Sequence, residues 1–414
     1  MKLVLLGIFL LALEGCSHTA ASKSNDIIIG KIDSIYSKTL GEERKIWVYM
    51  PHGDDGPSAS GQRYPVVYLL DGDAHFSSVM GMIQQLSEVN GNTVCPDMIL
   101  VGIPNTVRIR DLTPTRAATG YNKNDSNSVR ASGGGENFTA FIEKELMPHI
   151  DSLYPTAPYR MLIGHSLGGL MVINILVHHP QLFSAYLAID PSMWWDDRKL
   201  LRQADSALAR GQFTGKTLFL GVANTMPQGM DTAQVRKDTA GNTLHIRSIL
   251  DLADALKRES NNGLRWSYKY YDKDNHGSVP LICEYDALRF VFDYYSSPVF
   301  NKLFDSSMSA PAAVTAVSDH YKMISGHMGY TVLPPEDYIN QMGYNFLQSK
   351  MLPKAEAFFK LNIDNHPKSG NAYDSMGDFY AETGDKAKAI DYYSKALALS
   401  NDPDTKRKLE KLKQ

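Results

Sequence analysis

The chain has few cysteines and no large excess of charge of one sign. Its 414 residues include three cysteines, Cys16, Cys95 and Cys283, whose spacing matches no zinc-binding pattern, so we expect neither a bound metal nor a cofactor. We expect Cys95 and Cys283 to be core thiols, with a bridge between them left open. A formal net charge of −3 gives no general attraction to nucleic acid or to an anionic membrane surface.

Beyond the N-terminus the sequence lacks any apolar run long enough to span a bilayer. Lys2 precedes an apolar run over residues 3–13, which is typical of a signal peptide core. We therefore expect residues 1–21 to be a targeting segment and the protein to be exported. Residues 13–16 resemble a bacterial lipoprotein box, although Glu14 is unusual there. Lipid anchoring at Cys16 and ordinary cleavage nearer Ala20 and Ala21 both remain open, so the expected location is periplasmic or anchored to an envelope membrane.

A candidate nucleophile lies between a predicted strand and a predicted helix. Residues 164–169 read Gly-His-Ser-Leu-Gly-Gly, an apolar run at 159–163 precedes them, and a buried helix pattern at 170–177 follows. A G-x-S-x-G motif alone is a weak signal, but strand, motif and helix together indicate a nucleophile elbow with Ser166 at its turn. The backbone N–H of Leu167, at the helix start, would face an oxyanion on a bound acyl group.

The candidate base is His276. In α/β-hydrolases the triad follows the chain order serine, acid, histidine. His276 follows an alternating strand pattern at residues 264–271, on a loop that can reach over the sheet edge. The alternative is a surface-turn histidine. His178 and His179 end the helix after the motif, and His245 lies within a predicted helix, so none of these three is favoured.

Two carboxylates compete for the role of the acid. The strand predicted at residues 216–222 is followed by a long segment that carries Asp231 and Asp238. Asp238 directly precedes a predicted helix and is closer to His276 in sequence, so we favour it. Asp231 remains the alternative, and either could instead be a carboxylate that leads a helix.

The second oxyanion donor is expected on the loop after the third strand. That strand is predicted at residues 64–70, and Gly72 next to it allows a tight turn. The N–H of Asp73 is therefore the expected partner of the Leu167 N–H.

Aromatic and basic residues supply candidate substrate contacts. Trp194 and Trp195 follow a predicted strand at residues 186–189, near the sheet edge where ligands bind. They could wall an acyl or aromatic pocket, or pack as a lid. Arg110, together with Arg108 and Arg116 on the same long loop, could meet an anionic substrate or be solvated.

Four segments carry a resemblance to a known family. They are YLLDGD at 68–73, GHSLGG at 164–169, DPSMWW at 190–195 and NHGSVP at 275–280. With these segments in order over residues 26–295, the chain resembles the putative esterase (esterase D) family, which includes enterochelin and other siderophore esterases, feruloyl esterases and mycolyltransferases. The resemblance implies an α/β-hydrolase fold, Ser166 as nucleophile, His276 as base, and Asp73 and Leu167 as oxyanion donors. The long segment 224–239 departs from the family pattern, in which the acid often follows the strand closely.

The C-terminal part shows a repeat of 34 residues, the tetratricopeptide period. Small and aromatic residues recur at this offset, which resembles two tetratricopeptide repeats over residues 335–402. Because two repeats are fewer than such arrays need alone, we expect them to dock on the hydrolase or on a protein partner. The pairs are Met342 and Met376, Gly343 and Gly377, Phe346 and Tyr380, Ala355 and Ala389, and Phe359 and Tyr393.

The sequence thus predicts a mostly parallel α/β-hydrolase sheet flanked by helices, plus a small all-α module. The expected divisions are a signal segment (1–21), a hydrolase domain (26–298), a connecting helix (299–334), two repeats (335–402) and a capping helix (403–414). The favoured function is a serine esterase that cleaves a small-molecule carboxylic ester through an acyl-enzyme. An acyltransferase with a sugar or lipid acceptor and a non-catalytic interaction protein are the alternatives.

Overall fold

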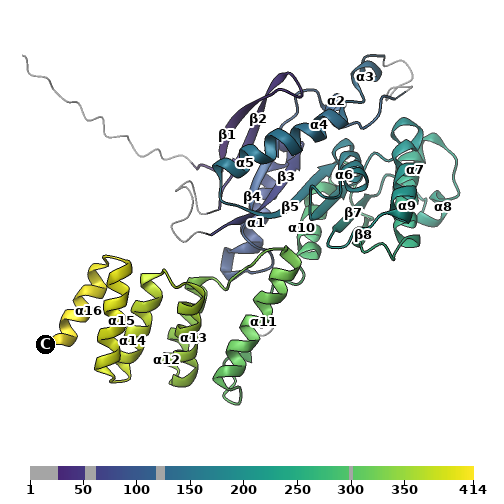
Figure 1. Cartoon of the computed structure of the whole chain (residues 1–414). Helices are drawn as coiled ribbons and strands as arrows, with labels where there is room; N and C mark the ends of the chain where they lie inside the picture. The colour runs from purple at the N-terminus through teal and green to yellow at the C-terminus, as the bar shows by residue number, and fades with distance from the viewer. Residues whose placement is uncertain (1–26, 52–61, 118–125, 298–301) are drawn as a thin grey trace, which may run out of the picture.

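The computed structural model describes residues 27–51, 62–117, 126–297 and 302–414. The predicted signal segment and Cys16 therefore lie outside the described residues. One eight-stranded sheet runs in the order β1-β2-β4-β3-β5-β6-β7-β8 (Figure 1). The β1–β2 and β2–β4 pairs are antiparallel, and the other neighbouring pairs are parallel. The strands are β1 (Lys31–Ser37), β2 (Glu42–Tyr49), β3 (Tyr64–Leu70), β4 (Ile99–Ile103), β5 (Thr156–His165), β6 (Ala185–Ile189), β7 (Thr217–Ala223) and β8 (Arg265–Tyr271).

Helices cover both faces of the sheet because its central strands are apolar on both sides. In β3 every residue is buried: Tyr68 and Leu70 belong to one apolar cluster and Val67 and Leu69 to the other. The first cluster includes α4 (Gly135–Phe141), α5 (Met147–Leu153), α6 (Leu167–His178), α7 (Trp195–Arg210) and α9 (Leu244–Arg258). The second includes α1 (Gly72–Ser87) and α10 (Val279–Val291). The predicted α/β-hydrolase class is confirmed.

Some local expectations need adjustment. Residues 135–153 form α4, a π-helical turn at Ile142–Leu146 and α5 in succession. Short helices α2 (Arg108–Asp111), α3 (Ser126–Ala131) and α8 (Thr232–Val235) occupy segments expected to be loops. Cys95 and Cys283 are both buried and free, as expected for core thiols.

The C-terminal region is all helical, and its helices lie side by side (Figure 1). Gly343 packs against the Phe359 ring so closely that a Cβ would lie 2.6 Å from it, and Gly377 packs on Tyr393 in the same way at 2.5 Å. The two helix pairs therefore make equivalent close contacts, while their assignment to the tetratricopeptide family stays a prediction. The helices are α12 (Glu336–Gln348), α13 (Leu352–Asn365), α14 (Gly370–Glu382), α15 (Lys386–Leu399) and α16 (Pro403–Lys413).

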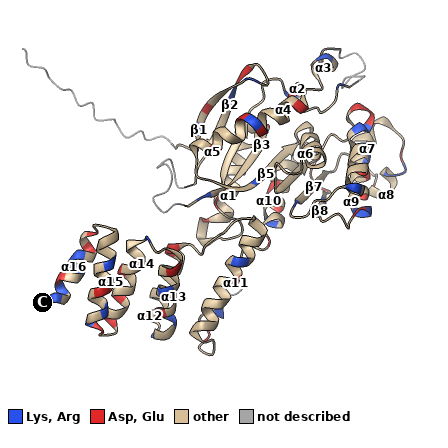
Figure 2. Ribbon diagram, in the orientation of Figure 1, with Lys and Arg blue, Asp and Glu red and all other residues tan. Residues whose placement is uncertain are grey.

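Helix α11 (Ala310–Met328) joins the two parts of the chain. Its Ile324 and Met328 belong to the second apolar cluster, the one beneath the sheet that includes α1 and α10. Its Ala313 and Val317 belong to the apolar cluster of the C-terminal helices. Basic and acidic residues are interspersed over α12–α16 (Figure 2). Across the described residues, none of the helices combines the length and apolarity needed to cross a bilayer.

Candidate active site

Ser166 lies at a strained turn between β5 and α6. Its backbone has φ 60° and ψ −113°, a conformation that a serine rarely adopts. The strand and the helix approach so closely that a Cβ on Gly164 would lie 2.4 Å from the backbone carbon of Gly168. The two glycines of the motif therefore permit the elbow, which presents the serine hydroxyl at the C-terminal edge of the sheet.

Ser166, His276 and Asp190 form a hydrogen-bonded chain. The Ser166 Oγ lies 3.1 Å from the His276 Nε2, and the His276 Nδ1 lies 2.6 Å from the Asp190 Oδ2. An ionised carboxylate can only accept, so Nδ1 carries the proton, and Nε2 is left to accept from the serine hydroxyl. This is the geometry of a nucleophile, a base and an orienting acid.

Asp190 directly follows β6 and has no solvent exposure. Its Oδ1 accepts the Ala223 N–H at 2.9 Å, and its Oδ2 accepts from both His276 and His245, the latter at 2.8 Å. Burial raises the pKa of the carboxyl, but the hydrogen bonds from His245 and His276 outweigh it and hold the pKa well below its usual range. The carboxylate is therefore ionised at neutral pH.

This arrangement corrects the placement of the acid expected from the sequence. Asp238 accepts the Thr243 hydroxyl at 2.7 Å, and Asp231 caps α8 by accepting the N–H groups of Ala233 and Gln234. Asp231 thus has the alternative role of a helix-leading carboxylate, whereas Asp238 holds the turn before α9. The hydrogen bond of the His276 Nδ1 goes to Asp190 instead. The carboxylate on the histidine comes from the end of β6, one strand earlier than expected.

The sequence contained a usable signal for Asp190. It is the first residue after an apolar strand pattern, which places a carboxylate at the same sheet edge as the serine. His245 gave a weaker signal, because a histidine in the first turn of a helix is ordinarily a surface residue. The packing of α9 against α7 and β7 brings His245 to Asp190.

The two expected oxyanion donors lie in the first turns of two helices. Leu167 begins α6 and Asp73 is the second residue of α1, positions at which N–H groups have no acceptor within the helix. The turn before α1 is held by Asp71, which is in the left-handed conformation with φ 54°. The Arg108 guanidinium donates to both Asp71 carboxylate oxygens at 2.6 and 2.9 Å, and the Asn105 amide donates to one at 2.7 Å.

Two further groups flank the hydrogen-bonded chain. The Ser192 Oγ lies 3.3 Å from the Ser166 Oγ, and the Ser192 N–H donates to the Ser166 carbonyl at 3.0 Å. The ring of His165 packs on that of His276, with centroids 4.5 Å apart. Burial, together with the charge of a protonated His276, lowers the pKa of His165 to about 4, so this ring is a neutral support for the base.

The arginines expected to meet substrate are engaged within the protein. Arg110 pairs with Glu42 and Asp111, at 2.5 and 2.7 Å, and its pKa is raised by these bonds. Arg116 donates to the carbonyls of Val129 and Arg130, at 3.4 and 2.8 Å. Structural pairing therefore accounts for the position of both guanidinium groups.

The two tryptophans differ in burial. Trp195 is 2 % exposed, and its indole N–H donates to the Thr115 carbonyl at 2.9 Å, so it packs the region beside α7. Trp194 is half-buried against the same apolar cluster, with its ring centroid 5.9 Å from that of Trp195. Of the two, Trp194 retains the exposure that a pocket wall needs.

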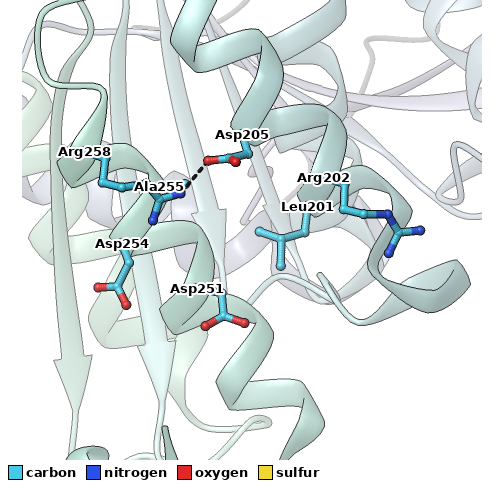
Figure 3. A pocket seen from close by; sticks show the side chains of 7 residues that line it. All are labelled: Leu201, Arg202, Asp205, Asp251, Asp254, Ala255 and Arg258. Atoms are coloured by element: carbon cyan, nitrogen blue, oxygen red, sulfur yellow. Dashed lines mark hydrogen bonds and ion pairs between the residues drawn. The ribbon is translucent and has the colours of Figure 1, made fainter.

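A separate pocket of about 280 Å³ lies between α7 and α9 (Figure 3). Leu201 and Ala255 contribute to it, but its lining is mostly charged, and Arg258 pairs with Asp205 across it at 2.5 Å. Ser166, Asp190 and His276 do not line it. Its paired charges suit solvation better than the binding of an ester.

Comparisons with known proteins show which family the chain matches and which proteins it is similar to. Residues 37–276, more than half of the chain, match the putative esterase family. The chain is 26% identical over 282 residues to ferri-bacillibactin esterase BesA of Bacillus subtilis, covering 66% of this chain and 93% of that protein. Among solved structures, an IroE-like serine hydrolase from Shewanella oneidensis is 31% identical with a TM-score of 0.67, covering 80% of this chain and 98% of that one.

A third likeness concerns the fold alone. An uncharacterised protein from Capnocytophaga ochracea is 17% identical with a TM-score of 0.59, and the match covers 93% of this chain and 99% of that one. A match of this extent includes much of the C-terminal region as well as the sheet. With the family match spanning β2 to the loop that carries His276, the chain belongs to the putative esterase family.

Proposed function

We propose that this chain is an exported serine hydrolase that cleaves carboxylic esters, with Ser166 as nucleophile, His276 as general base and Asp190 as the orienting acid. The observation that carries the proposal is the hydrogen-bonded chain from the Ser166 Oγ through His276 to Asp190, with distances of 3.1 and 2.6 Å. The strained backbone at Ser166 and the membership of the esterase family support it.

The reaction follows from the positions of these groups. His276 Nε2 takes the proton of the Ser166 hydroxyl as Oγ attacks the ester carbonyl, and the Asp190 carboxylate stabilises the imidazolium that forms. The N–H groups of Leu167 and Asp73 stabilise the oxyanion. The imidazolium then gives its proton to the leaving alkoxide, and an acyl-enzyme remains on Ser166. Water activated by the same histidine hydrolyses the acyl-enzyme and restores the serine.

For the substrate we propose a siderophore-type ester, such as a trilactone of acylated hydroxy amino acids. The support is similarity: BesA is named a ferri-bacillibactin esterase, and a second relative, 31% identical over 172 residues that cover 55% of its length, is named a siderophore enterobactin esterase, from Emericella nidulans. Half-buried Trp194 offers an aromatic surface beside the sheet edge for such a ligand.

The test compares hydrolysis by the wild type with that by Ser166→Ala, on a p-nitrophenyl ester and on a panel of trilactone, feruloyl and small acyl esters. We expect Ser166→Ala to lower kcat by roughly 10⁴-fold or more with the fold intact, because the hydroxyl is the attacking group. Ser192→Ala is the matched control, since it removes a hydroxyl 3.3 Å away, and it should remain within about tenfold of the wild type. A folded Ser166→Ala protein with near wild-type rates would refute the proposed nucleophile.

We further propose that residues 1–21 direct export and that the C-terminal helices contact a protein partner or select large substrates. The mass of the mature N-terminus decides between lipidation at Cys16 and cleavage nearer Ala20 and Ala21. A cytoplasmic protein with an intact Met1 would rule out both forms of export.

A further inference from the structure

A second histidine shares the Asp190 carboxylate with the proposed base. The His245 Nε2 lies 2.8 Å from the Asp190 Oδ2, and the His276 Nδ1 lies 2.6 Å from the same oxygen. The two rings are perpendicular, with centroids 5.1 Å apart. They come from separate elements, the first turn of α9 and the loop after β8. In the proposed mechanism His245 takes no part in the proton transfers.

These three side chains have the donor set of a transition-metal site. One ligand atom from each of Asp190, His245 and His276 lies within 4.8 Å of the other two. Two imidazole nitrogens and an ionised carboxylate suit Zn²⁺, which binds such ligands in tetrahedral geometry and leaves a fourth position to water. Among the described residues, this is the grouping in which three such ligands converge.

Small movements would make room for the ion. Bonds of about 2.0–2.2 Å in a tetrahedron place ligand atoms about 3.3 Å apart, whereas the two imidazole nitrogens now lie 2.8 and 2.6 Å from the oxygen. Each nitrogen–oxygen pair therefore has to move apart by a fraction of an ångström, and all three ligand atoms already lie within 4.8 Å of one another. The His276 side chain is 41% exposed and that of His245 is 20% exposed, so the ion can reach them from solvent.

We propose that Asp190, His245 and His276 form a Zn²⁺ site, and that zinc bound there switches off the hydrolase. Zinc takes the lone pair of the His276 Nδ1, which loses its proton to solvent, and Nε2 takes up a proton in its place. His245 changes tautomer in the opposite sense, from Nε2–H to Nδ1–H, so the net proton balance is zero. The protonated Nε2 of His276 can then no longer accept the Ser166 proton. The inhibition rests on the proposed function, whereas the binding does not.

Binding is tested by calorimetric titration of zinc onto the full chain. We expect one zinc ion per wild-type chain, and we expect His245→Gln and His276→Gln each to weaken binding by at least about tenfold. His149→Gln is the matched control, since His149 pairs with Asp33 at 2.7 Å and offers two ligands rather than three. Ser166→Ala should bind as the wild type does. Absence of binding to the wild type, or equal binding by His245→Gln, would overturn the site.

Inhibition is tested on the hydrolysis of a p-nitrophenyl ester. We expect zinc to inhibit the wild type and His149→Gln at the concentrations that saturate the calorimetric site. Inhibition of His245→Gln should shift by the same factor as its binding, measured relative to its own zinc-free rate. Magnesium should not inhibit, because it prefers an octahedral set of oxygen ligands. Full activity of the zinc-loaded wild type would overturn the switch, whereas zinc binding by a chain without esterase activity would refute only the proposed function.

Discussion

Asp190 accepts three hydrogen bonds, from the Ala223 N–H and from the rings of His245 and His276, while its side chain has no exposure to solvent. These bonds hold the pKa of the carboxyl well below its usual range against the effect of burial. Protonation of Asp190 therefore does not limit the hydrolase at mildly acidic pH.

The first prediction at this scale concerns the identity of the acid. Asp190→Asn should lower kcat by about 10⁴-fold, because an amide can hold His276 in the wrong tautomer; the corresponding change in a serine protease is the source of this magnitude. Asp238→Asn is the matched control and should be close to wild type, since its carboxylate accepts from Thr243 instead. Steady-state kinetics on one ester measure both. If Asp238→Asn lost most of its kcat while Asp190→Asn kept it, Asp238 would be the acid in place of Asp190.

Local sequence signals identified some of these residues and missed others for a physical reason. Ser166 could be predicted because the elbow needs small residues at fixed offsets, and His276 because chain order restricts the base to the loop after the last strand. The acid could not be chosen by spacing, because carboxylates at the ends of β6 and β7 can both reach the same histidine. Only the packed sheet shows which of them does.

At the scale of elements, the helices beneath the sheet meet at a buried carboxyl group. Glu284 on α10 is 1% exposed and accepts from the Ser78 hydroxyl of α1 at 3.4 Å. The Nδ1 of His75, which is also on α1, lies 3.7 Å from the other carboxyl oxygen of Glu284. Burial raises the pKa of Glu284 to about 8. The group is therefore neutral in the folded protein at pH 7, although it would be ionised in the unfolded chain.

This raised pKa predicts how stability changes with pH. Between the ordinary pKa of 4.5 and about 8, the unfolded chain loses the Glu284 proton and the folded protein keeps it, so rising pH favours unfolding. Glu284→Gln cannot ionise and should gain stability relative to the wild type across this window, by about 3–5 kcal/mol at most. Urea unfolding at pH 5 and pH 8.5 measures the difference, with exposed Glu382→Gln as control. A difference that stays constant between the two pH values would contradict the account.

At the scale of the whole molecule, α11 packs on both parts of the chain. Tyr294 stacks on His327 with ring centroids 4.1 Å apart, and the His320 Nε2 lies 3.1 Å from the Tyr295 carbonyl. Ile324 and Met328 complete the apolar cluster beneath the sheet. A domain boundary near residue 298 therefore cuts through packed structure. A boundary after α11 instead leaves the apolar cluster beneath the sheet covered.

This packing predicts where the chain can be shortened. A chain that ends at Leu333 should be soluble and active on small esters, because it keeps α11 on the sheet. Of the buried residues in the C-terminal cluster, it uncovers only Leu303, Ala313 and Val317. A chain that ends at Ser297 should aggregate or lose stability, because it exposes the surface under Ile324 and Met328. Size-exclusion chromatography and p-nitrophenyl ester hydrolysis compare them. Equal solubility and activity of both would show that α11 adds nothing to the hydrolase.

The overall fold was largely predictable, because alternating apolar strands and helices with an elbow motif determine an α/β-hydrolase sheet. The 34-residue offset also indicated paired helices, and the equivalent packing of Gly343 and Gly377 agrees with it. The role of α11 was not predictable. Its two apolar faces belong to different clusters, and a sequence pattern does not say which partner covers each face.

The central claim is that Ser166 is a nucleophile activated by His276, and covalent labelling tests it most directly. A fluorophosphonate should attach once per chain, on the peptide that contains Ser166, with labelling abolished in Ser166→Ala and slowed strongly in His276→Gln. Mass spectrometry of the digested protein identifies the site. A label on another serine, or equal labelling rates for His276→Gln and the wild type, would contradict the account.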